Sequence, residues 1–154
     1  MDISNSKTVK LLIERYGYYF YIIKRYPKIK CTCLDPVTKD ANPKCKKCLG
    51  LGTQIRIHKV FGVIREVKER EISIAQNLSV SPKIVYIKGL CYVNKDDVVI
   101  DSENIYHVFN FQYHRGEQGD FHFTRLICPN TKNNAASLLR NFKELLNEHK
   151  LRKN

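Results

Sequence analysis

The chain has 154 residues, of which 43% are hydrophobic and 10% aromatic, and its formal net charge is +12. This is the length of one ordinary domain with enough apolar side chains for a core, which excludes a disordered polar chain. The longest apolar run, residues 16–23, is far shorter than the roughly 20 residues a bilayer requires, which excludes a membrane-spanning helix. No secretory leader is expected, so the six cysteines are interpreted as thiols or metal ligands in a reducing compartment.

The N-terminal part of the chain predicts a helix followed by a strand. Apolar side chains between residues 9 and 16 recur with the helical period of about 3.6 residues. We expect Gly17 to end this helix in the left-handed conformation. Residues 18–23 are aromatic and β-branched, which favours a strand that ends within residues 24–27.

After the cysteine-rich stretch the pattern changes to short strands. Alternating apolar side chains predict a strand over residues 55–67, with a bulge at Gly62 where the alternation slips. Residues 73–82 are predicted to form a loop, and residues 83–93 a further strand. Turn-forming residues on both sides then bound a short strand at 98–100.

The C-terminal third contains the clearest hairpin and a helix. Apolar side chains over 106–113 and 121–127 flank a polar turn at 115–120, which predicts two paired strands. Over 134–151 we predict an amphipathic helix, whose apolar stripe is Leu138, Leu139, Phe142, Leu145 and Leu146. The chain is therefore interpreted as a single domain, 1–154, of α+β class and mainly β: a small antiparallel β-barrel or curled sheet flanked by N- and C-terminal helices.

Four of the six cysteines lie in residues 28–52, a stretch with few large apolar side chains. Cys31 and Cys33 form one close pair, and Cys45 and Cys48 form the other. Four thiolates complete a tetrahedron, so we predict a zinc-ribbon insertion whose structural zinc replaces the missing core and has no open position for catalysis. A redox pair at Cys45 and Cys48 is the alternative, but the pair lacks the helix and βαβ setting of such motifs. Four free thiols would leave the segment with nothing to hold it.

The remaining residues capable of chemistry fit structural roles. Cys91 and Cys128 lie in apolar strand contexts and are interpreted as small hydrophobic residues. We expect the histidines near the hairpin to face solvent and the clustered aspartates to form turns. These residues are His107, His114, His122, Asp96, Asp97 and Asp101. No nucleophile, base and oxyanion donor come together in the sequence, so we do not expect an enzyme.

Basic residues are concentrated in the first 60 positions, which hold 13 Lys and Arg against 4 Asp and Glu. Such a block attracts phosphates or acidic surfaces, while the plainer interpretation is a solvated face. Tyrosines interleave with the first of these basic residues, which suits a core strand and a protein interface better than base stacking. The candidate contacts to a partner or to nucleic acid are Lys24, Arg25, Lys44, Lys46, Lys47 and Arg56.

The cysteine stretch has a distinctive sequence: residues 31–39 read CTCLDPVTK and residues 42–52 read NPKCKKCLGLG, after the lead-in LLIERYG at 11–17. This CxCxDPVT…PxCxxCxGxG ribbon, behind a helix and a Tyr-Gly-led strand, resembles the small virion proteins of tailed bacteriophages. Residues 96–101 and 104–108 are similar to a strand pair of head–tail connector and neck proteins. The resemblance covers most of the chain from residue 8 to residue 128.

The resemblance implies a structural virion protein, a ring-forming subunit at the portal, neck or head–tail junction. Its partners would be portal, neck or tail proteins and further copies of itself, with non-specific contact to DNA in the channel and none to a membrane. It would be assembled in the host cytoplasm and located in the virion. The alternative function is a small nucleic-acid-binding zinc-ribbon protein, such as a phage regulator.

Overall fold

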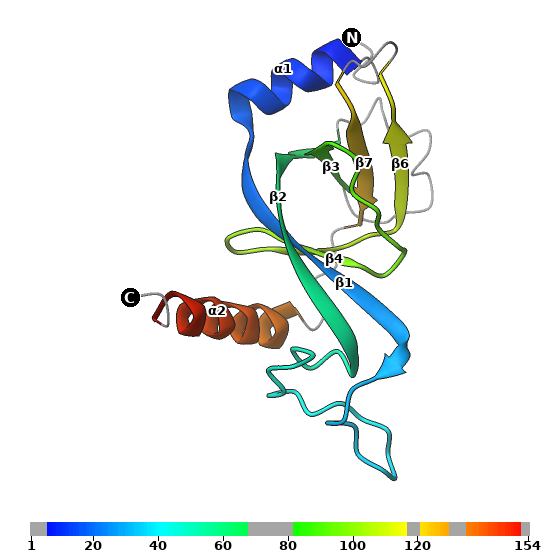
Figure 1. The fold of residues 1–154 in the computed structure, drawn as a ribbon, viewed down its shortest axis with the longest axis vertical. Helices are drawn as coiled ribbons and strands as arrows, with labels where there is room; N and C mark the ends of the chain where they lie inside the picture. Colours follow the sequence, from blue (N-terminus) through cyan, green and yellow to red (C-terminus); the bar gives the residue numbers. More distant parts are fainter. Residues whose placement is uncertain (1–5, 68–81, 117–120, 130–134, 152–154) are drawn as a thin grey trace.

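The computed structural model describes residues 6–67, 82–116, 121–129 and 135–151. These residues form one seven-stranded sheet of order β5-β4-β1-β2-β3-β7-β6, in which every strand pair is antiparallel (Figure 1). The predicted fold class is confirmed, as a curled sheet rather than a closed barrel, with a helix at each end of the chain. In chain order the elements are α1 (Ser6–Tyr16), β1 (Tyr18–Lys30), β2 (Thr53–Glu66), β3 (Lys83–Lys88), β4 (Val98–Ile100), β5 (Ile105–His107), β6 (Asn110–His114), β7 (Phe123–Cys128) and α2 (Ala135–Leu151).

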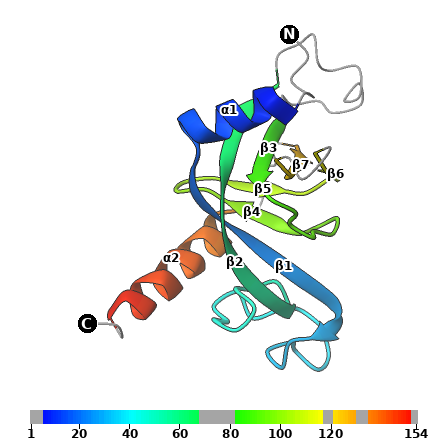
Figure 2. The same ribbon diagram turned by 45° about the horizontal axis from the view of Figure 1, so that its top comes forward.

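The two faces of the sheet bury different cores, because successive side chains of a strand point to opposite faces. One face holds a single core to which both ends of the sheet contribute, for example Tyr106 of β5 and Leu126 of β7. The sheet must curl around this inner core for its two ends to meet there. The other face carries two separate cores, one under α1 and one under α2, and the helices cover different halves of it (Figure 2).

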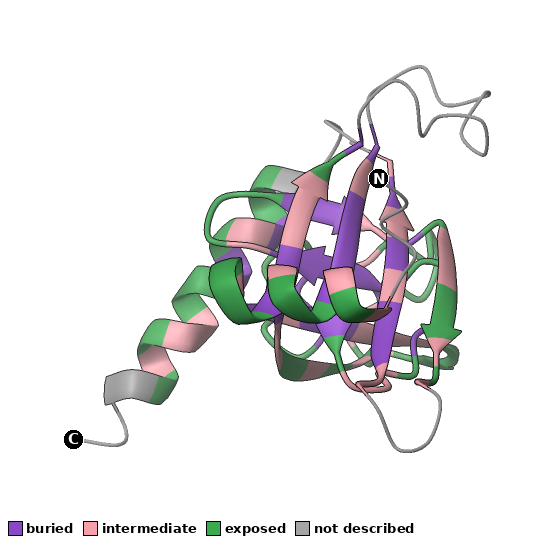
Figure 3. Cartoon of the chain, turned by 90° about the horizontal axis from the view of Figure 1, so that it is seen from above, coloured by how far each residue is buried: buried purple, intermediate pink, exposed green. Residues whose placement is uncertain are grey.

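Both helices dock by the apolar stripes that their sequences predict. In α1, Val9 and Ile13 are fully buried against β2 and β3. In α2, Leu138 and Phe142 are buried, and Leu139, Leu145 and Leu146 are partly buried in the same core. Seen from above, buried positions lie along the strands beneath α1, whereas α2 extends away from the body toward its C-terminal end (Figure 3). Among the described residues, no helix combines the length and apolar character needed to cross a bilayer.

The predicted single strand over 106–113 is wrong, because the chain changes partner at Val108 and Phe109. Val108 N donates to Asp97 O at 2.8 Å, beside β4, and Phe109 N donates to Ile127 O at 2.9 Å, in β7. The segment therefore forms two strands, β5 and β6, at opposite ends of the sheet order. The hairpin of β6 with β7 is confirmed. The predicted polar turn lies largely outside the described residues.

Two glycines serve close backbone approach, and the roles predicted for them are wrong. Gly17 does not have a positive φ, but a Cβ there would lie 2.3 Å from Ile13 O, where α1 meets β1. At Gly62 β2 keeps a regular register with both neighbours, so there is no bulge. A Cβ at Gly62 would lie 2.1 Å from Tyr86 O. Glycine at this position lets β2 cross close to β3.

β1 and β2 continue beyond the rest of the sheet as a two-stranded arm, residues 24–30 and 53–59. β1 does not end within 24–27 as predicted, and a register shift between Tyr26 and Lys30 accommodates Pro27. β4 pairs with β1 only at Tyr21–Ile23, and β3 pairs with β2 only from Gly62 onward. The arm therefore pairs only with itself, and it carries at its end residues 31–52, the cysteine loop (Figure 1).

The connections around β4 follow the sequence in most details. β3 ends at Lys88, earlier than predicted, and Gly89 with a φ of 82° redirects the chain. The turn before β4 is confirmed, and within it the buried Asp97 accepts hydrogen bonds from Arg25 N at 2.9 Å and Asn94 N at 2.8 Å. The predicted loop at 73–82 lies, apart from Pro82, outside the described residues.

Candidate metal centre

The four cysteines of the cysteine loop meet at the end of the arm. Their four Sγ atoms all lie within 4.8 Å of one another. The Sγ atoms of Cys31 and Cys45 are 3.8 Å apart, and those of Cys33 and Cys48 are 3.5 Å apart. A tetrahedral ion with metal–sulfur bonds of about 2.3 Å separates its sulfurs by about 3.8 Å. The predicted residues therefore form a cluster that could hold a metal ion.

The backbone after the second cysteine pair turns so that N–H groups point at sulfur. Leu49, Gly50 and Gly52 have φ values of 54°, 84° and 71°, left-handed conformations that glycine adopts without strain. As a result Gly52 N lies 3.3 Å from Cys48 Sγ, as a donor. On the other side of the pair, the N–H groups of Lys47 and Cys48 donate to Cys45. Donors aimed at sulfur stabilise thiolates, the form that binds metal.

The thiols of the cluster differ in how readily they ionise. Burial opposes ionisation of Cys45, but the donors around its sulfur outweigh burial and lower its pKa to about 7. Burial raises the pKa of Cys48 to about 12, and burial also raises the pKa of Cys33. Of these three thiols Cys45 ionises most readily, and a bound cation must displace the protons of Cys48 and Cys33.

The cysteine loop is fastened to α2 by a polar contact that the sequence analysis missed. Asn141 is only 4% exposed, and its Nδ2 donates to Pro43 O at 2.6 Å and lies 3.4 Å from Leu49 O. Leu49 is buried in the core under α2, and Lys46 forms an ion pair with Glu148. The signal in the sequence was an asparagine beside Phe142, on the edge of an otherwise apolar stripe.

The other two cysteines lie in the inner core. Cys128 is fully buried, and burial raises its pKa to about 12. Cys91 is half-buried against the same core, and burial raises its pKa as well. Both therefore stay protonated at neutral pH and pack as small apolar side chains, in agreement with the sequence interpretation.

The basic candidate residues fall into separate groups. Lys24 and Arg56 are register partners on one face of the arm, where the Arg56 guanidinium lies 5.7 Å from the centre of the Tyr26 ring. Arg25 points to the opposite face of β1 and is half-buried, while its backbone N–H binds Asp97. The remaining three, Lys44, Lys46 and Lys47, are exposed together on the cysteine loop.

The histidines near the hairpin are half-buried, so the prediction that they face solvent is wrong. His114 stacks on Phe123 with ring centres 4.4 Å apart, and His122 Nδ1 accepts a hydrogen bond from Gly116 N at 3.2 Å. Burial lowers the pKa of His107 and of His114, which keeps both rings neutral at physiological pH. These histidines pack against the sheet, and they are not arranged as a ligand cluster.

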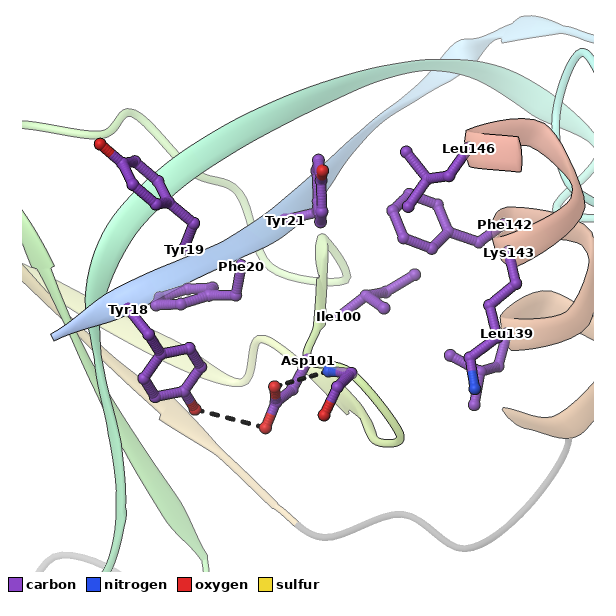
Figure 4. A pocket seen from close by; sticks show the side chains of 11 residues that line it. Tyr18, Tyr19, Phe20, Tyr21, Ile100, Asp101, Leu139, Phe142, Lys143 and Leu146 are labelled. Carbon is purple, nitrogen blue, oxygen red and sulfur yellow. Dashed lines mark hydrogen bonds between the residues drawn. The ribbon is translucent and has the colours of Figure 1, made fainter. Parts of the chain in front are cut away.

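A hollow of about 540 Å³ lies between β1, the end of β4 and α2 (Figure 4). Its walls are mainly aromatic and aliphatic, with Lys143 at the side of α2. Tyr18 Oη donates a hydrogen bond to Asp101 Oδ2 at 3.3 Å, and burial together with this carboxylate raises the pKa of Tyr18 well above its usual value. Tyr18 stays protonated at neutral pH, and its hydrogen bond to Asp101 joins β1 to the turn after β4.

Neither a scan against protein-family models nor a search of curated proteins finds a match for this chain. The candidate metal centre therefore rests on its own geometry: a four-cysteine cluster on an arm of a curled antiparallel sheet.

Proposed function

We propose that this chain is a structural assembly subunit of a tailed-phage virion, part of a ring at the portal, neck or head–tail junction, with one structural zinc ion. The observation that carries the proposal is the four-cysteine cluster at the end of the β1–β2 arm. The sequence of this loop is also where the resemblance to phage virion proteins is most specific. A metal at this position stabilises a projecting surface rather than a reaction site.

Zinc is the ion that best suits the cluster. Four thiolates fill a tetrahedral shell and leave no position for water or substrate, which is the donor set of structural zinc. Iron also binds four thiolates, but a site that only holds a loop together needs no redox change. In the proposed function Cys31, Cys33, Cys45 and Cys48 are the ligands, and N–H donors favour the ionised form of Cys45.

Exposed apolar side chains at two ends of the molecule support the proposed ring. A head-to-tail ring needs two different patches on each subunit, because each patch meets the other on the next copy. At the end of the molecule that carries α1, Leu11 and Tyr16 are 66% and 60% exposed. At the opposite end, Ile29 on the arm and Val37 on the cysteine loop are 51% and 86% exposed. In the proposed ring these two patches meet.

Size-exclusion chromatography with light scattering tests the assembly role. We expect masses that are multiples of the 18.0 kDa chain and that rise with protein concentration. Leu11→Gln should reduce assembly, whereas Glu14→Gln on the same helix should not. If the protein is a monomer at every concentration and also fails to bind a phage portal, the assembly role is wrong.

The second candidate is a nucleic-acid-binding zinc-ribbon protein, and the exposed lysines of the cysteine loop favour it. Lysines act as point charges on phosphates and do not read bases, so such binding would be non-specific and steeply salt-dependent. A monomer or dimer that binds duplex DNA, with affinity falling sharply as salt rises, would support this candidate over the ring.

A further inference from the structure

A groove opens between β2 and the segment that follows β3. β3 pairs with β2 only over Gly62–Glu66, and beyond Lys88 the chain is held by β7 instead, where Cys91 N donates to Thr124 Oγ1 at 2.8 Å. Upstream of Gly62, β2 therefore has no strand partner on this side among the described residues. A hollow of about 530 Å³ occupies the split between the two segments.

The charged side chains that line this groove all have the same sign. Lys24 and Lys59 come from β1 and β2, and Lys88 comes from the end of β3 on the other side. His58 adds a fourth nitrogen-bearing side chain, and none of the residues that line the groove is a carboxylate. His58, Lys59 and Lys88 are exposed to solvent. The Asp97 carboxylate, which is not part of the lining, interacts electrostatically with Lys24. The lining itself carries only positive charge, which attracts a polyanion.

Two tyrosines in the groove walls present their rings to solvent. Tyr19 is 63% exposed, and its ring is held by Phe61, with ring centres 5.0 Å apart, and by Lys59, whose Nζ lies 4.5 Å from the ring centre. Tyr92 is 65% exposed and is held by Tyr113 at 5.6 Å. Exposed rings fixed by their neighbours are platforms for unstacked bases, because every base has a flat face to stack.

We propose that this groove binds single-stranded nucleic acid, with phosphates on Lys24, Lys59 and Lys88 and bases against Tyr19 and Tyr92. Stacking on these tyrosines requires bases that are not already stacked in a duplex, so the site favours a single strand. The inference goes beyond the assembly role. It gives the second candidate function a site that is separate from the cysteine loop and includes none of the loop's lysines.

Fluorescence anisotropy with the purified, metal-loaded full chain tests the proposal. The probes are labelled oligo-dT and oligo-U of about 15 nucleotides and a mixed-sequence duplex of the same length, at about 50 and about 200 mM salt. We expect both single strands to bind more tightly than the duplex. Equal or tighter binding of the duplex, or no saturable binding of either strand at low salt, would overturn the proposal.

Matched variants locate the binding. Lys59→Gln with Lys88→Gln should lower the slope of log affinity against log salt by about 1.4, at about 0.7 per phosphate contact, whereas the control pair Lys10→Gln with Lys95→Gln should not. Tyr92→Ala should weaken binding about tenfold, and Tyr92→Phe should retain it. Unchanged thermal unfolding shows that each variant is folded. If only a Lys44, Lys46 and Lys47 to Gln variant weakens binding, the groove is wrong and nucleic acid binds at the cysteine loop instead.

Discussion

The same two strands, β1 and β2, pass through two regions that are stabilised in different ways. Within the sheet body, side chains on both faces of β1 are buried, as Phe20 and Ile22 are on the inner face and Ile23 is on the outer face. Along the arm Ile55 and Ile57 are only partly buried toward α2, and the loop at its end brings together four sulfurs and the contact to Asn141. The body is therefore held mainly by apolar burial, whereas the proposed metal site would make the stability of the cysteine loop depend on metal and pH.

Loss of the metal ion should produce the largest difference in stability between the sheet body and the cysteine loop. Structural zinc contributes apparent free energies of about 10–16 kcal/mol in small zinc modules. We expect Cys45→Ser to lose the ion and to increase amide exchange across residues 31–52, while β3 and β7 stay protected. Cys91→Ser, away from the cluster, should keep one metal per chain.

Elemental analysis together with hydrogen exchange measures both effects. A wild-type protein purified with well under one metal ion per chain would contradict the centre itself. Iron in place of zinc would keep the centre and correct the ion.

Phe142→Ala should have the next largest effect, because this residue joins the two regions. Phe142 is 3% exposed and its ring lies 5.1 Å from that of Tyr21 in β1. Truncating a buried phenylalanine costs about 3–5 kcal/mol of the free energy of unfolding. Urea unfolding should show this loss, whereas Lys143→Ala on the exposed side of α2 should change stability by less than about 0.5 kcal/mol. Equal stability of the two variants would show that α2 is not docked in solution.

Asn141→Ala should loosen the cysteine loop and leave the sheet intact. The variant leaves the Pro43 and Leu49 carbonyl groups without the donor that α2 provides, at a cost of about 1–3 kcal/mol. We expect faster amide exchange in the cysteine loop with unchanged metal content. Asn147→Ala, at an exposed position of the same helix, is the control, and an identical exchange pattern in both variants would remove the role assigned to Asn141.

Acidification should weaken metal binding by a smaller, graded amount. The pKa of Cys48 is raised to about 12, so this thiol is protonated across the physiological range until a cation displaces its proton. Each proton released on binding lowers the affinity about tenfold for each unit by which the pH falls, so affinity rises with pH. A competition titration with a chromophoric chelator at several pH values measures the slope. A flat profile would show that the cluster is already ionised without metal.

The sequence predicts the parts of this molecule that depend on local pattern. Periodicity is sufficient for α1 and for the stripe on α2, and the spacing of the cysteine pairs is sufficient to place all four in one cluster. It is not sufficient at Val108 and Phe109, because an alternating apolar pattern is the same whether a strand keeps its partner or changes it.

The features that the sequence does not predict arise where segments that are distant in the chain lie against each other. Gly62 looks like a break in a pattern until Tyr86 of the neighbouring strand is seen against it. Asn141 looks like one more polar residue of an exposed helix face until the Pro43 carbonyl group is found beside it. The groove lined by Lys59, Lys88 and Tyr92 has no local signature, since it exists only where β2 and β3 separate.

The contact between Asn141 and Pro43 joins residues that are 98 positions apart in the chain. During synthesis the cysteine loop leaves the ribosome long before α2 does, because translation proceeds from the N-terminus. A cysteine cluster that binds a metal ion can therefore do so while the loop still lacks the helix that later fixes it. If the proposed zinc site is correct, a polypeptide arrested before α2 would carry a loaded but undocked metal centre.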